Sequence, residues 1–267
     1  MTSWMVAPVA FAAMIAGAFL AIFLARRAPD DFFSEKTQDT FKVTVGLTAT
    51  MTSLLLGLMT NSMRYSYAST EEDVQQYAVA LITTDLELRH FGEDACAARQ
   101  ELFKFVRLVI SETWSSDKHP PQTGFETDAT NQLLKLDASV RALTAVSDDQ
   151  RVSRSNAKAS VKALLTHRWK LSGDAENRIP PLFIFVVVCW LTLIFTSFGW
   201  FSSTNLPSIL ALTLSAGAIS GALFLVVEMG EPFSGPMRVA SAPLRNTLQA
   251  MEAHPCALDT TPAATAQ

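Results

Sequence analysis

The chain has 267 residues, of which 49% are hydrophobic and only 17% are charged, and its formal net charge is −4. Soluble domains carry roughly 25% charged residues, so this composition disfavours an ordinary soluble enzyme. The high hydrophobicity also excludes a disordered chain, and the slightly acidic balance gives no reason to expect a nucleic-acid partner. Three cysteines cannot form a disulfide framework, and their positions in the sequence suggest no pair.

The hydrophobic residues are concentrated in four stretches. Each stretch approaches or meets the roughly 20 apolar residues that a helix needs to cross the hydrocarbon core of a bilayer. We therefore predict transmembrane helices at about residues 5–24, 43–63, 181–201 and 207–228. No Lys or Arg precedes the first stretch, and Arg26-Arg27 follows it in place of a small-residue cleavage site, which favours a retained helix over a cleaved signal peptide.

The four helices form two hairpins that enclose a polar region. The predicted parts are a first transmembrane hairpin in residues 1–63, a helical central region in 64–179, a second transmembrane hairpin in 180–230 and a C-terminal segment in 231–267. Between Arg64 and Arg178 the chain has 15 Lys or Arg and 17 Asp or Glu, which is an ordinary charge density for a water-exposed region. We expect residues 253–267, at the end of the chain, to form a frayed tail.

Four crossings place both termini and the central region on the same side of the membrane. Near the membrane, that side carries Arg64, Arg168, Lys170, Arg178, Arg238 and Arg245, whereas the other side carries Arg26, Arg27, Lys36 and Lys42. Cytoplasmic loops have an excess of Lys and Arg, so we predict that the termini and the central region are cytoplasmic. Thiols in the cytoplasm are kept reduced, in agreement with three unpaired cysteines.

The central region has helical signals throughout and no strand signals. The segment Arg64–Phe91 continues the second membrane stretch without a break, and Gly92 is a good helix stop, because glycine adopts the left-handed conformation cheaply. Further helices are predicted over Glu93–Trp114, from Thr127 or Asp128, and from Ser147 to about Ser172, with a loop over Ser115–Gly124. The fold class is therefore all-α.

The third of these segments has the pattern of a helix that packs along its neighbours. Its apolar residues alternate at spacings of four and three, and they are Ala129, Leu133, Leu136, Val140 and Leu143. Catalytic and metal-binding patterns are harder to find: the four histidines are not at metal-ligand spacing, and there is no phosphate loop or nucleophile elbow. We therefore expect no enzyme, no cofactor and no metal site.

The second membrane helix has a polar face. On a helical wheel, one sector of roughly 100° contains the small and polar residues Gly46, Thr50, Ser53, Gly57, Thr60 and Asn61. A second, smaller stripe contains Thr44, Thr48 and Thr52. Small and hydroxyl residues let membrane helices pack closely, but they also line water-filled paths, where they replace part of an ion's hydration shell. Both interpretations apply together if one stripe packs and the other faces a pore.

Two further patterns accompany the fourth membrane helix. Gly217 and Gly221 have the small-residue spacing of tight helix contacts. The motif after the helix contains Glu228, Glu231, Pro232, Phe233, Gly235 and Arg238. Glu228 borders the hydrocarbon core, where an unpaired charge is expensive, so we expect it to pair with Arg178 or Arg238. A charged ring at a pore mouth and a cation site are the alternative interpretations.

Four groups of motifs together resemble the bacterial bestrophin-like membrane proteins, a family defined by a domain of unknown function. They are Val45–Leu58; His90–Glu93 with Ala98-Arg99 and Glu112–Trp114; Ile179-Pro180 with Trp190-Leu191 and Phe198-Gly199; and Phe224–Glu228, Glu231–Gly235 and Ser241–Arg245. The resemblance covers roughly Phe41 to Met251. Glu231 stands where the family frequently has aspartate, which keeps the charge.

The resemblance implies a distant likeness to bestrophins, which are pentameric anion channels with cytoplasmic termini and a pore lined by the second helix. A bestrophin's aromatic pore neck and calcium-binding acidic cluster are not identifiable in this sequence. The leading hypothesis is therefore a homo-oligomeric, multi-pass protein of the bacterial inner membrane, embedded in the lipid bilayer, that conducts small ions as an anion channel. One rival is a non-conducting membrane protein whose central region binds a cytoplasmic partner or senses a signal; another is an enzyme with a site at the membrane interface.

Overall fold

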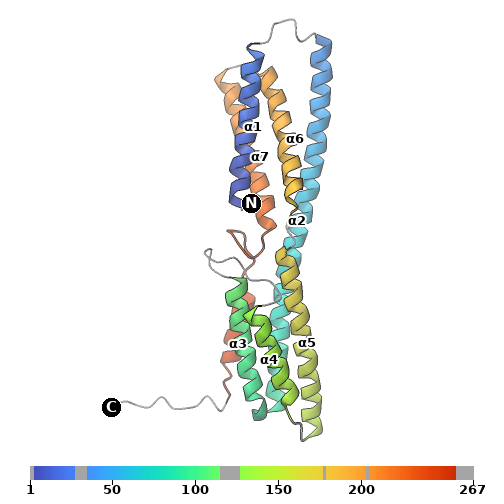
Figure 1. The fold of residues 1–267 in the computed structure, drawn as a ribbon, viewed down its shortest axis with the longest axis vertical. Coiled ribbons are helices and arrows are strands. Elements are labelled where there is room, and N and C mark those ends of the chain that lie inside the picture. Colours follow the sequence, from blue (N-terminus) through green and yellow to red (C-terminus); the bar gives the residue numbers. More distant parts are fainter. Residues whose placement is uncertain (1–2, 28–34, 115–126, 177–178, 203–204, 257–267) are drawn as a thin grey trace, which may run out of the picture. The chain divides into compact units, whose positions relative to one another are not determined.

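The structure is a computed structural model that describes residues 3–27, 35–114, 127–176, 179–202 and 205–256. Within these residues the chain forms helices and turns and no strand, which confirms the predicted all-α class (Figure 1). The loop predicted over Ser115–Gly124 and residues 257–267 of the predicted tail lie outside the described residues.

The helices are α1 (Ser3–Ala25), α2 (Glu35–Phe91), α3 (Cys96–Thr113), α4 (Asp128–Ala142), α5 (Asp148–Glu176), α6 (Pro181–Phe201), α7 (Leu206–Met229) and α8 (Ala242–Glu252), with a short 3-10 turn, η2 (Glu93–Ala95), before α3. Every one of these helices except α8 corresponds to a predicted helix, and α2 begins at Glu35, before the predicted start at Val43. The helices α1, α2, α6 and α7 are long and apolar enough to cross a membrane, which confirms the four predicted membrane helices.

The chain divides into two compact units. The membrane unit contains residues 1–66 and 178–230, and the helical unit contains residues 67–177 and 231–267. The helix α2 contributes to both units, because it continues without a break from Glu35 to Phe91. This continuity confirms that the second membrane helix extends beyond Arg64.

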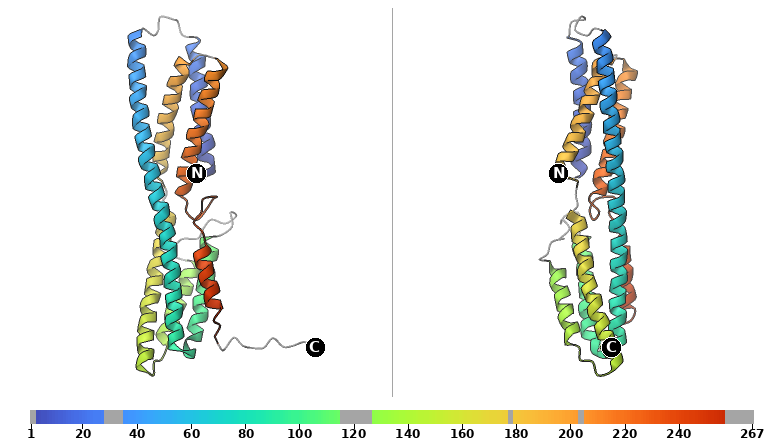
Figure 2. Two further views of the ribbon diagram at one scale, coloured as in Figure 1. Left: turned by 180° about the vertical axis from the view of Figure 1, so that it is seen from behind. Right: turned by 90° about the vertical axis from the view of Figure 1, so that its right-hand side faces the viewer.

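In the membrane unit, α1 packs along α6 and α7 (Figures 1 and 2). The core between these helices contains the buried residues Met14, Ala18, Val187, Phe195 and Leu223. Two glycines let α1 approach α6 closely. A Cβ atom added at Gly17 would lie 2.5 Å from Oγ1 of Thr196, and one added at Gly199 would overlap the backbone of Ala18.

The helical unit packs the end of α2, α3, α4, α5 and α8 around one apolar core. The end of α2 contributes one apolar stripe to this core, formed by the buried residues Val74, Tyr77, Ala78, Leu81 and Leu88. The predicted packing pattern of α4 is confirmed as well: Ala129, Leu133, Leu136 and Val140 are buried. An edge-to-face contact between Tyr77 and Phe105, with ring centroids 6.4 Å apart, joins α2 to α3.

The predicted helix boundaries in this unit have clear local causes. Gly92 follows α2 with a φ of +110°, which explains why glycine ends that helix. The hydroxyl of Thr127 accepts a hydrogen bond from the amide of Thr130 at the start of α4. At the start of α5, the amide of Gln150 donates to the hydroxyl of Ser147 at 3.1 Å, and the side chain of Gln150 accepts from the amide of Val146.

Two expectations for the C-terminal segment and the cysteines were wrong. The segment contains a helix that the sequence did not predict, α8, and residues 253–256 are not frayed, because Cys256 is buried and bonded to Cys96 in a disulfide. The two cysteines are 160 residues apart in sequence. Only the docking of α8 against α3 brings their backbones within reach, with Cα atoms 5.8 Å apart.

Candidate functional site

The predicted polar face of α2 lies on the surface of the membrane unit. Its six residues, Gly46, Thr50, Ser53, Gly57, Thr60 and Asn61, are all exposed. A Cβ atom added at Gly46 or Gly57 would meet nothing within 4 Å. Among the described residues, this face is therefore largely uncovered, although a polar face exposed to lipid is unfavourable.

The side chains on this face differ in how their hydrogen-bonding groups are used. The hydroxyls of Thr50 and Thr60 donate to the carbonyls of Gly46 and Leu56, at 2.9 and 2.7 Å. By contrast, the side chains of Ser53 and Asn61 make no hydrogen bond in the described part of the chain. Asn61 therefore exposes two N–H donors and one carbonyl acceptor, and Ser53 exposes a hydroxyl.

The second polar stripe of α2 turns toward its neighbours. Thr44 is exposed, but Thr52 is only 2% exposed, and both hydroxyls donate to the carbonyl four residues earlier. Beside Thr52, a groove of about 510 Å³ lies between α2, α6 and α7, with Ser53, Phe195 and Ser215 among its otherwise mainly apolar lining. Of the second stripe, only Thr52 is buried, so the assignment of one stripe to packing and the other to a pore stays a prediction.

The predicted contact glycines of α7 are open in the single chain. The nearest atom to a Cβ at Gly217 would be a ring carbon of Phe11 at 4.0 Å, and a Cβ at Gly221 would meet nothing within 4 Å. The neighbouring face of α7 is the one that packs against α1: Ala216 is buried, and the hydroxyl of Ser220 donates to the carbonyl of Ala7 at 2.6 Å. A tight contact through Gly217 and Gly221 remains a prediction for contact with another chain.

Glu228 is fully buried near the C-terminal end of α7. It is the first residue of the motif Glu228, Glu231, Pro232, Phe233, Gly235 and Arg238, which we call the exit motif. Neither of its carboxylate oxygens has a hydrogen-bond partner among the described residues. Of its predicted partners, Arg178 lies outside the described residues, and Arg238 is exposed. The ion pair therefore stays a prediction. A buried carboxylate near the negative end of a helix requires a proton, a cation or a donor.

The rest of the exit motif forms an ordered turn in the helical unit. The amide of Val239 donates to the carbonyl of Pro232 at 2.7 Å, and the indole N–H of Trp114 donates to the carbonyl of Val239 at 2.7 Å. The ring of Phe233 is buried edge-on against Trp114, with ring centroids 5.6 Å apart. Gly235 has a φ of +75°, and Glu231 accepts a hydrogen bond from Ser234. These contacts favour a structural role for this turn.

The helical unit also contains buried ion pairs that sequence analysis missed. Arg168 on α5 donates to Glu112 on α3 at 2.8 Å, and the other oxygen of Glu112 accepts from the amide of Ala129 at the start of α4. Arg99 on α3 pairs with Asp85 on α2 at 2.8 Å. These partners are 14 to 56 residues apart, so no local spacing could have revealed them.

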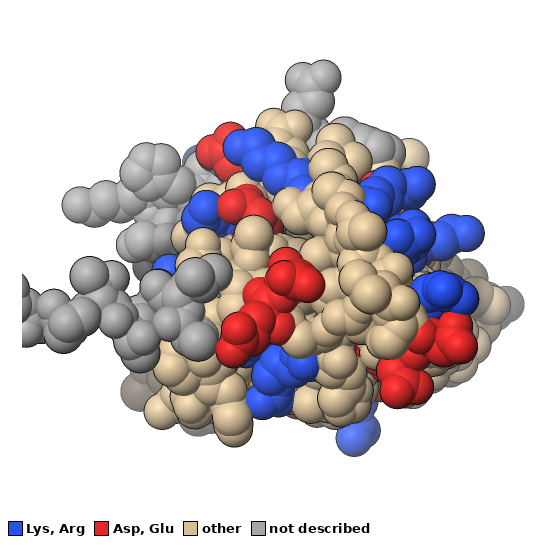
Figure 3. Space-filling model, turned by 90° about the horizontal axis from the view of Figure 1, so that it is seen from below, with Lys and Arg blue, Asp and Glu red and all other residues tan. Residues whose placement is uncertain are grey.

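The histidines and acidic residues show no metal site in the described part of the chain. His167 stacks on Tyr77 with ring centroids 5.8 Å apart, as a packing residue. Burial and then the nearby Lys170 lower the pKa of His167, against the opposing effect of Asp73. On the face seen in Figure 3, Lys and Arg are interspersed with Asp and Glu, so no patch of a single charge is visible there.

Comparison with known proteins agrees with this architecture. A family model described as the Bestrophin-like domain matches residues 12–244. Among solved structures, the chain is similar to the crystal structure of a bacterial bestrophin homologue from Klebsiella pneumoniae that carries one mutation, with a TM-score of 0.57 and 12% sequence identity, over 91% of this chain and 95% of that chain. A search of curated protein sequences finds no match. Because the family model spans most of the sequence, the chain belongs to the Bestrophin-like family.

Proposed function

We propose that this protein is a homo-oligomeric anion channel in which the polar face of α2 lines the pore. In this proposal the bilayer covers about residues 5–24, 43–63, 181–201 and 207–228. The central region, the C-terminal segment and both termini lie in the cytoplasm of a bacterium, because that side carries the larger number of basic residues near the membrane.

The observation that carries the proposal is the exposure of the polar face in a single chain. A lipid-facing helix surface is normally apolar, and polar groups in a membrane face a protein interior or a water-filled cavity. Here Gly46, Thr50, Ser53 and Asn61 are exposed on a helix that is otherwise apolar enough to span the bilayer. Assembly of several copies around this face would remove it from lipid and enclose water.

The chemistry of the face supports an anion. No charged residue occurs between Val43 and Met63, so nothing on the segment repels a chloride ion. Asn61 and Ser53 have N–H and O–H donors that no group in the described part of the chain uses. Donors of this kind can replace water around an anion. Membership of the Bestrophin-like family supports the same proposal.

The rival function, a partner-binding central region, was motivated by the apolar pattern of α4 and by the large share of the chain in that region. The first of these is accounted for within the subunit, because Ala129, Leu133, Leu136 and Val140 are buried in the core of the helical unit itself. That pattern therefore offers no free apolar surface to a partner, and we propose no second function.

The test is ion flux through purified protein reconstituted in liposomes, combined with the mass of the assembly. We expect an oligomer that conducts chloride in preference to sodium. Changing Thr50→Leu or Ser53→Leu should reduce the flux several-fold, because a larger apolar side chain narrows and dehydrates the path. A monomer or dimer without flux at any pH, calcium concentration or voltage tested would contradict the channel.

The chain offers a matched control in Thr44→Leu. Like Thr50, Thr44 is exposed, and its hydroxyl donates to the carbonyl four residues earlier at 2.9 Å. It lies about 120° around the helix from Thr50 at 100° per residue. We expect Thr44→Leu to leave the flux unchanged. If Thr44→Leu blocks the flux and Thr50→Leu does not, the polar face assigned here is not the pore.

A further inference from the structure

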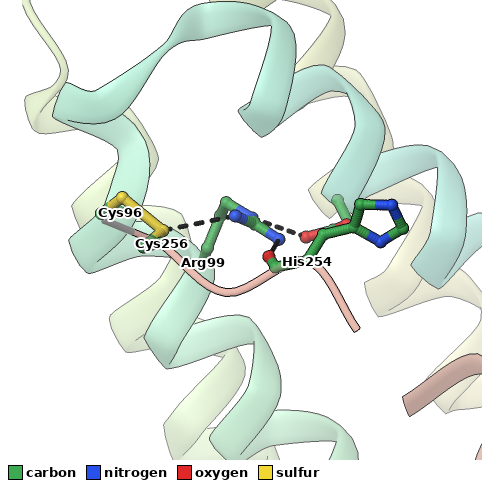
Figure 4. The surroundings of a disulfide bond; sticks show 5 residues. Cys96, Arg99, His254 and Cys256 are labelled. Atoms are coloured by element: carbon green, nitrogen blue, oxygen red, sulfur yellow. Dashed lines mark hydrogen bonds and ion pairs between the residues drawn. A yellow bond between two sulfur atoms is a disulfide. The ribbon is translucent and has the colours of Figure 1, made fainter. Parts of the chain in front are cut away.

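Figure 4 shows that a disulfide joins Cys96, the first residue of α3, to Cys256, which lies four residues beyond the end of α8. Both cysteines belong to the helical unit and are buried. The third cysteine, Cys189 on α6, is free. The bond fixes the last described residue of the C-terminal segment on the start of α3.

Beyond the end of α8, the segment has few other polar anchors in the described part of the chain. Arg99 donates from Nη2 to the carbonyl of His254 at 2.9 Å. The ion pair between Arg107 and Glu252 is exposed and contributes little. The helix α8 itself is held by buried Leu244 and Met251. Opening of residues 253–256 would therefore expose Cys256 without unfolding the helical unit.

The charges around Cys256 favour a reactive sulfur. Arg99 is 5% exposed, and its Nη1 lies 3.3 Å from Sγ of Cys256. Arg99 pairs with Asp85 at 2.8 Å, and Asp85 also pairs with Arg89 at 3.1 Å, so the carboxylate is shared between two guanidinium groups and neutralises Arg99 only in part. In the disulfide, the Nη1–H group of Arg99 has only a weak acceptor, the neutral sulfur of Cys256. In the reduced protein, the Cys256 thiolate would be a negatively charged and therefore stronger acceptor.

Cys96 has an independent feature with the same effect. It is the first residue of the 18-residue helix α3, where the helix dipole stabilises a negative charge, although its own N–H donates to the carbonyl of Glu93 and the exposed carboxylates of Glu93 and Asp94 in η2 act in the opposite sense. Both sulfurs therefore lie where the thiolate is favoured. This environment is typical of exchangeable cysteines rather than inert ones, because stabilised thiolates speed the exchange reaction and make the disulfide easier to reduce.

We propose that Cys96 and Cys256 form a reversible thiol–disulfide exchange site that locks the C-terminal segment onto α3, with Arg99 as the positioning residue that activates Cys256. The co-reactant is a small-molecule or protein disulfide, of the class of oxidised glutathione. This inference rests on the proposed cytoplasmic location of the helical unit. In the cytoplasm the resting state is the dithiol, and oxidation forms the disulfide that holds the C-terminal segment on α3.

The chemistry is a two-step exchange. The Cys256 thiolate attacks one sulfur of the external disulfide, forms a mixed disulfide and expels one external thiolate. The Cys96 thiolate then attacks the Cys256 sulfur, which forms the intramolecular bond and expels the second external thiolate. Two electrons pass from the two cysteines to the external disulfide, and the two protons released from the cysteines are taken up by the two external thiolates.

The first test follows the pair in cells that express the full-length Cys189→Ser protein. Cells are quenched with acid and treated with a maleimide that adds mass to each free thiol. We expect two labelled thiols during growth and none after brief treatment with diamide, a thiol oxidant, with recovery after its removal. A pair that stays oxidised during growth, or that never forms the disulfide, would overturn the proposal.

The second test isolates the role of Arg99 in the purified, reduced protein. In Asp85→Asn/Arg99→Gln the guanidinium donor beside Cys256 is removed together with the carboxylate that it pairs with, so no buried carboxylate loses its partner and the net charge, with Arg89 retained, stays the same. Because the Nη1–H donor beside Cys256 is lost, the reaction with oxidised glutathione at pH 7 should slow severalfold, since the smaller thiolate fraction is only partly offset by greater nucleophilicity. The midpoint of the rate against pH should rise.

A conservative variant and a structural readout complete the design. Arg99→Lys keeps a positive charge and should retain the low midpoint. An unchanged rate profile in both variants would remove Arg99 from the site. Amide hydrogen exchange should be at least tenfold faster in residues 252–256 of the reduced protein than in the oxidised protein, with α4 unchanged as an internal reference. Equal protection of residues 252–256 in both forms would show that the disulfide does not hold the C-terminal segment on α3.

Discussion

Two buried carboxylates, one in each unit, differ in whether hydrogen-bond donors surround them. In the helical unit, Glu112 and Arg168 are buried together, and every oxygen of the carboxylate has a donor. Glu228 in the membrane unit is fully buried, and neither oxygen has a donor among the described residues. Because unpaired buried charges are costly, the two residues respond oppositely to neutralisation.

The substitution Glu228→Gln should not destabilise the protein. It keeps the shape of the side chain and removes a charge that no described residue neutralises, so we expect a gain of about 1–3 kcal/mol. Thermal unfolding in detergent measures the effect, with Glu112→Gln as the comparison, because this change weakens a buried ion pair and should lower the melting temperature. A loss of stability in Glu228→Gln would instead reveal a bound cation or a donor from outside the described residues.

The stability of the helical unit should fall in weak acid, in part through His167. Its pKa is lowered by burial and by Lys170, whereas unfolding returns the pKa to about 6.5. The unfolded chain then binds the proton more tightly, so stability is lost as the pH falls through about 6.5. In His167→Phe, which keeps a ring on Tyr77, the melting temperature should fall less between pH 7.5 and pH 5.5. An identical fall in both proteins would contradict this role.

At the scale of helices, the contact between α1 and α6 depends on glycines that the sequence analysis did not select. Gly17 and Gly199 lie where the helices meet, whereas the selected pair, Gly217 and Gly221, is open. All four glycines lie in apolar helices, and their sequence contexts do not separate them. Only the relative rotation of α1 and α6 determines which glycine faces a backbone.

The substitution Gly199→Ala should therefore be destabilising. Its Cβ would overlap the backbone of Ala18, which cannot move aside as a flexible side chain does. We expect a loss of about 1–3 kcal/mol, as for other overpacked cores. Gly173→Ala on α5 is the matched control: nothing lies within 4 Å of its Cβ, and replacing a helical glycine should stabilise by about 1 kcal/mol. Similar melting temperatures for the two variants would contradict the close contact.

At the scale of the whole molecule, the open faces of the membrane unit are the reason to expect an assembly. Among the described residues, the polar face of α2 and the glycines of α7 are exposed in the subunit, although both have the composition of helix contacts. Two separate faces on one subunit are what a ring requires, because each subunit meets two neighbours.

The substitution Gly221→Leu should weaken the assembly without unfolding the subunit. A leucine at an open surface position is harmless in a monomer but blocks a close helix contact between copies. Native mass spectrometry should detect smaller species, while the helical content stays the same. Gly173→Leu, at an open position outside the membrane helices, should keep the original mass. An intact assembly in Gly221→Leu would exclude this glycine from the interface.

The sequence by itself determined the features that depend on local patterns. Hydrophobic length identified the four membrane helices, the continuous pattern identified the extension of α2 to Phe91, and Gly92, Thr127 and Ser147 marked helix ends through short-range backbone chemistry. The apolar pattern of α4 identified the residues that this helix contributes to the core of the helical unit. Each of these signals acts over one or two helical turns.

Only the tertiary structure decided which distant residues meet. Cys96 and Cys256 are paired because α8 docks on α3, and neither α8 nor its docking site was predicted from a local pattern. The same holds for Arg168 with Glu112 and for Gly199 with Ala18. Such contacts depend on the packing of helices that are far apart in the chain, and that packing follows from burial and shape summed over the whole unit rather than from any local spacing.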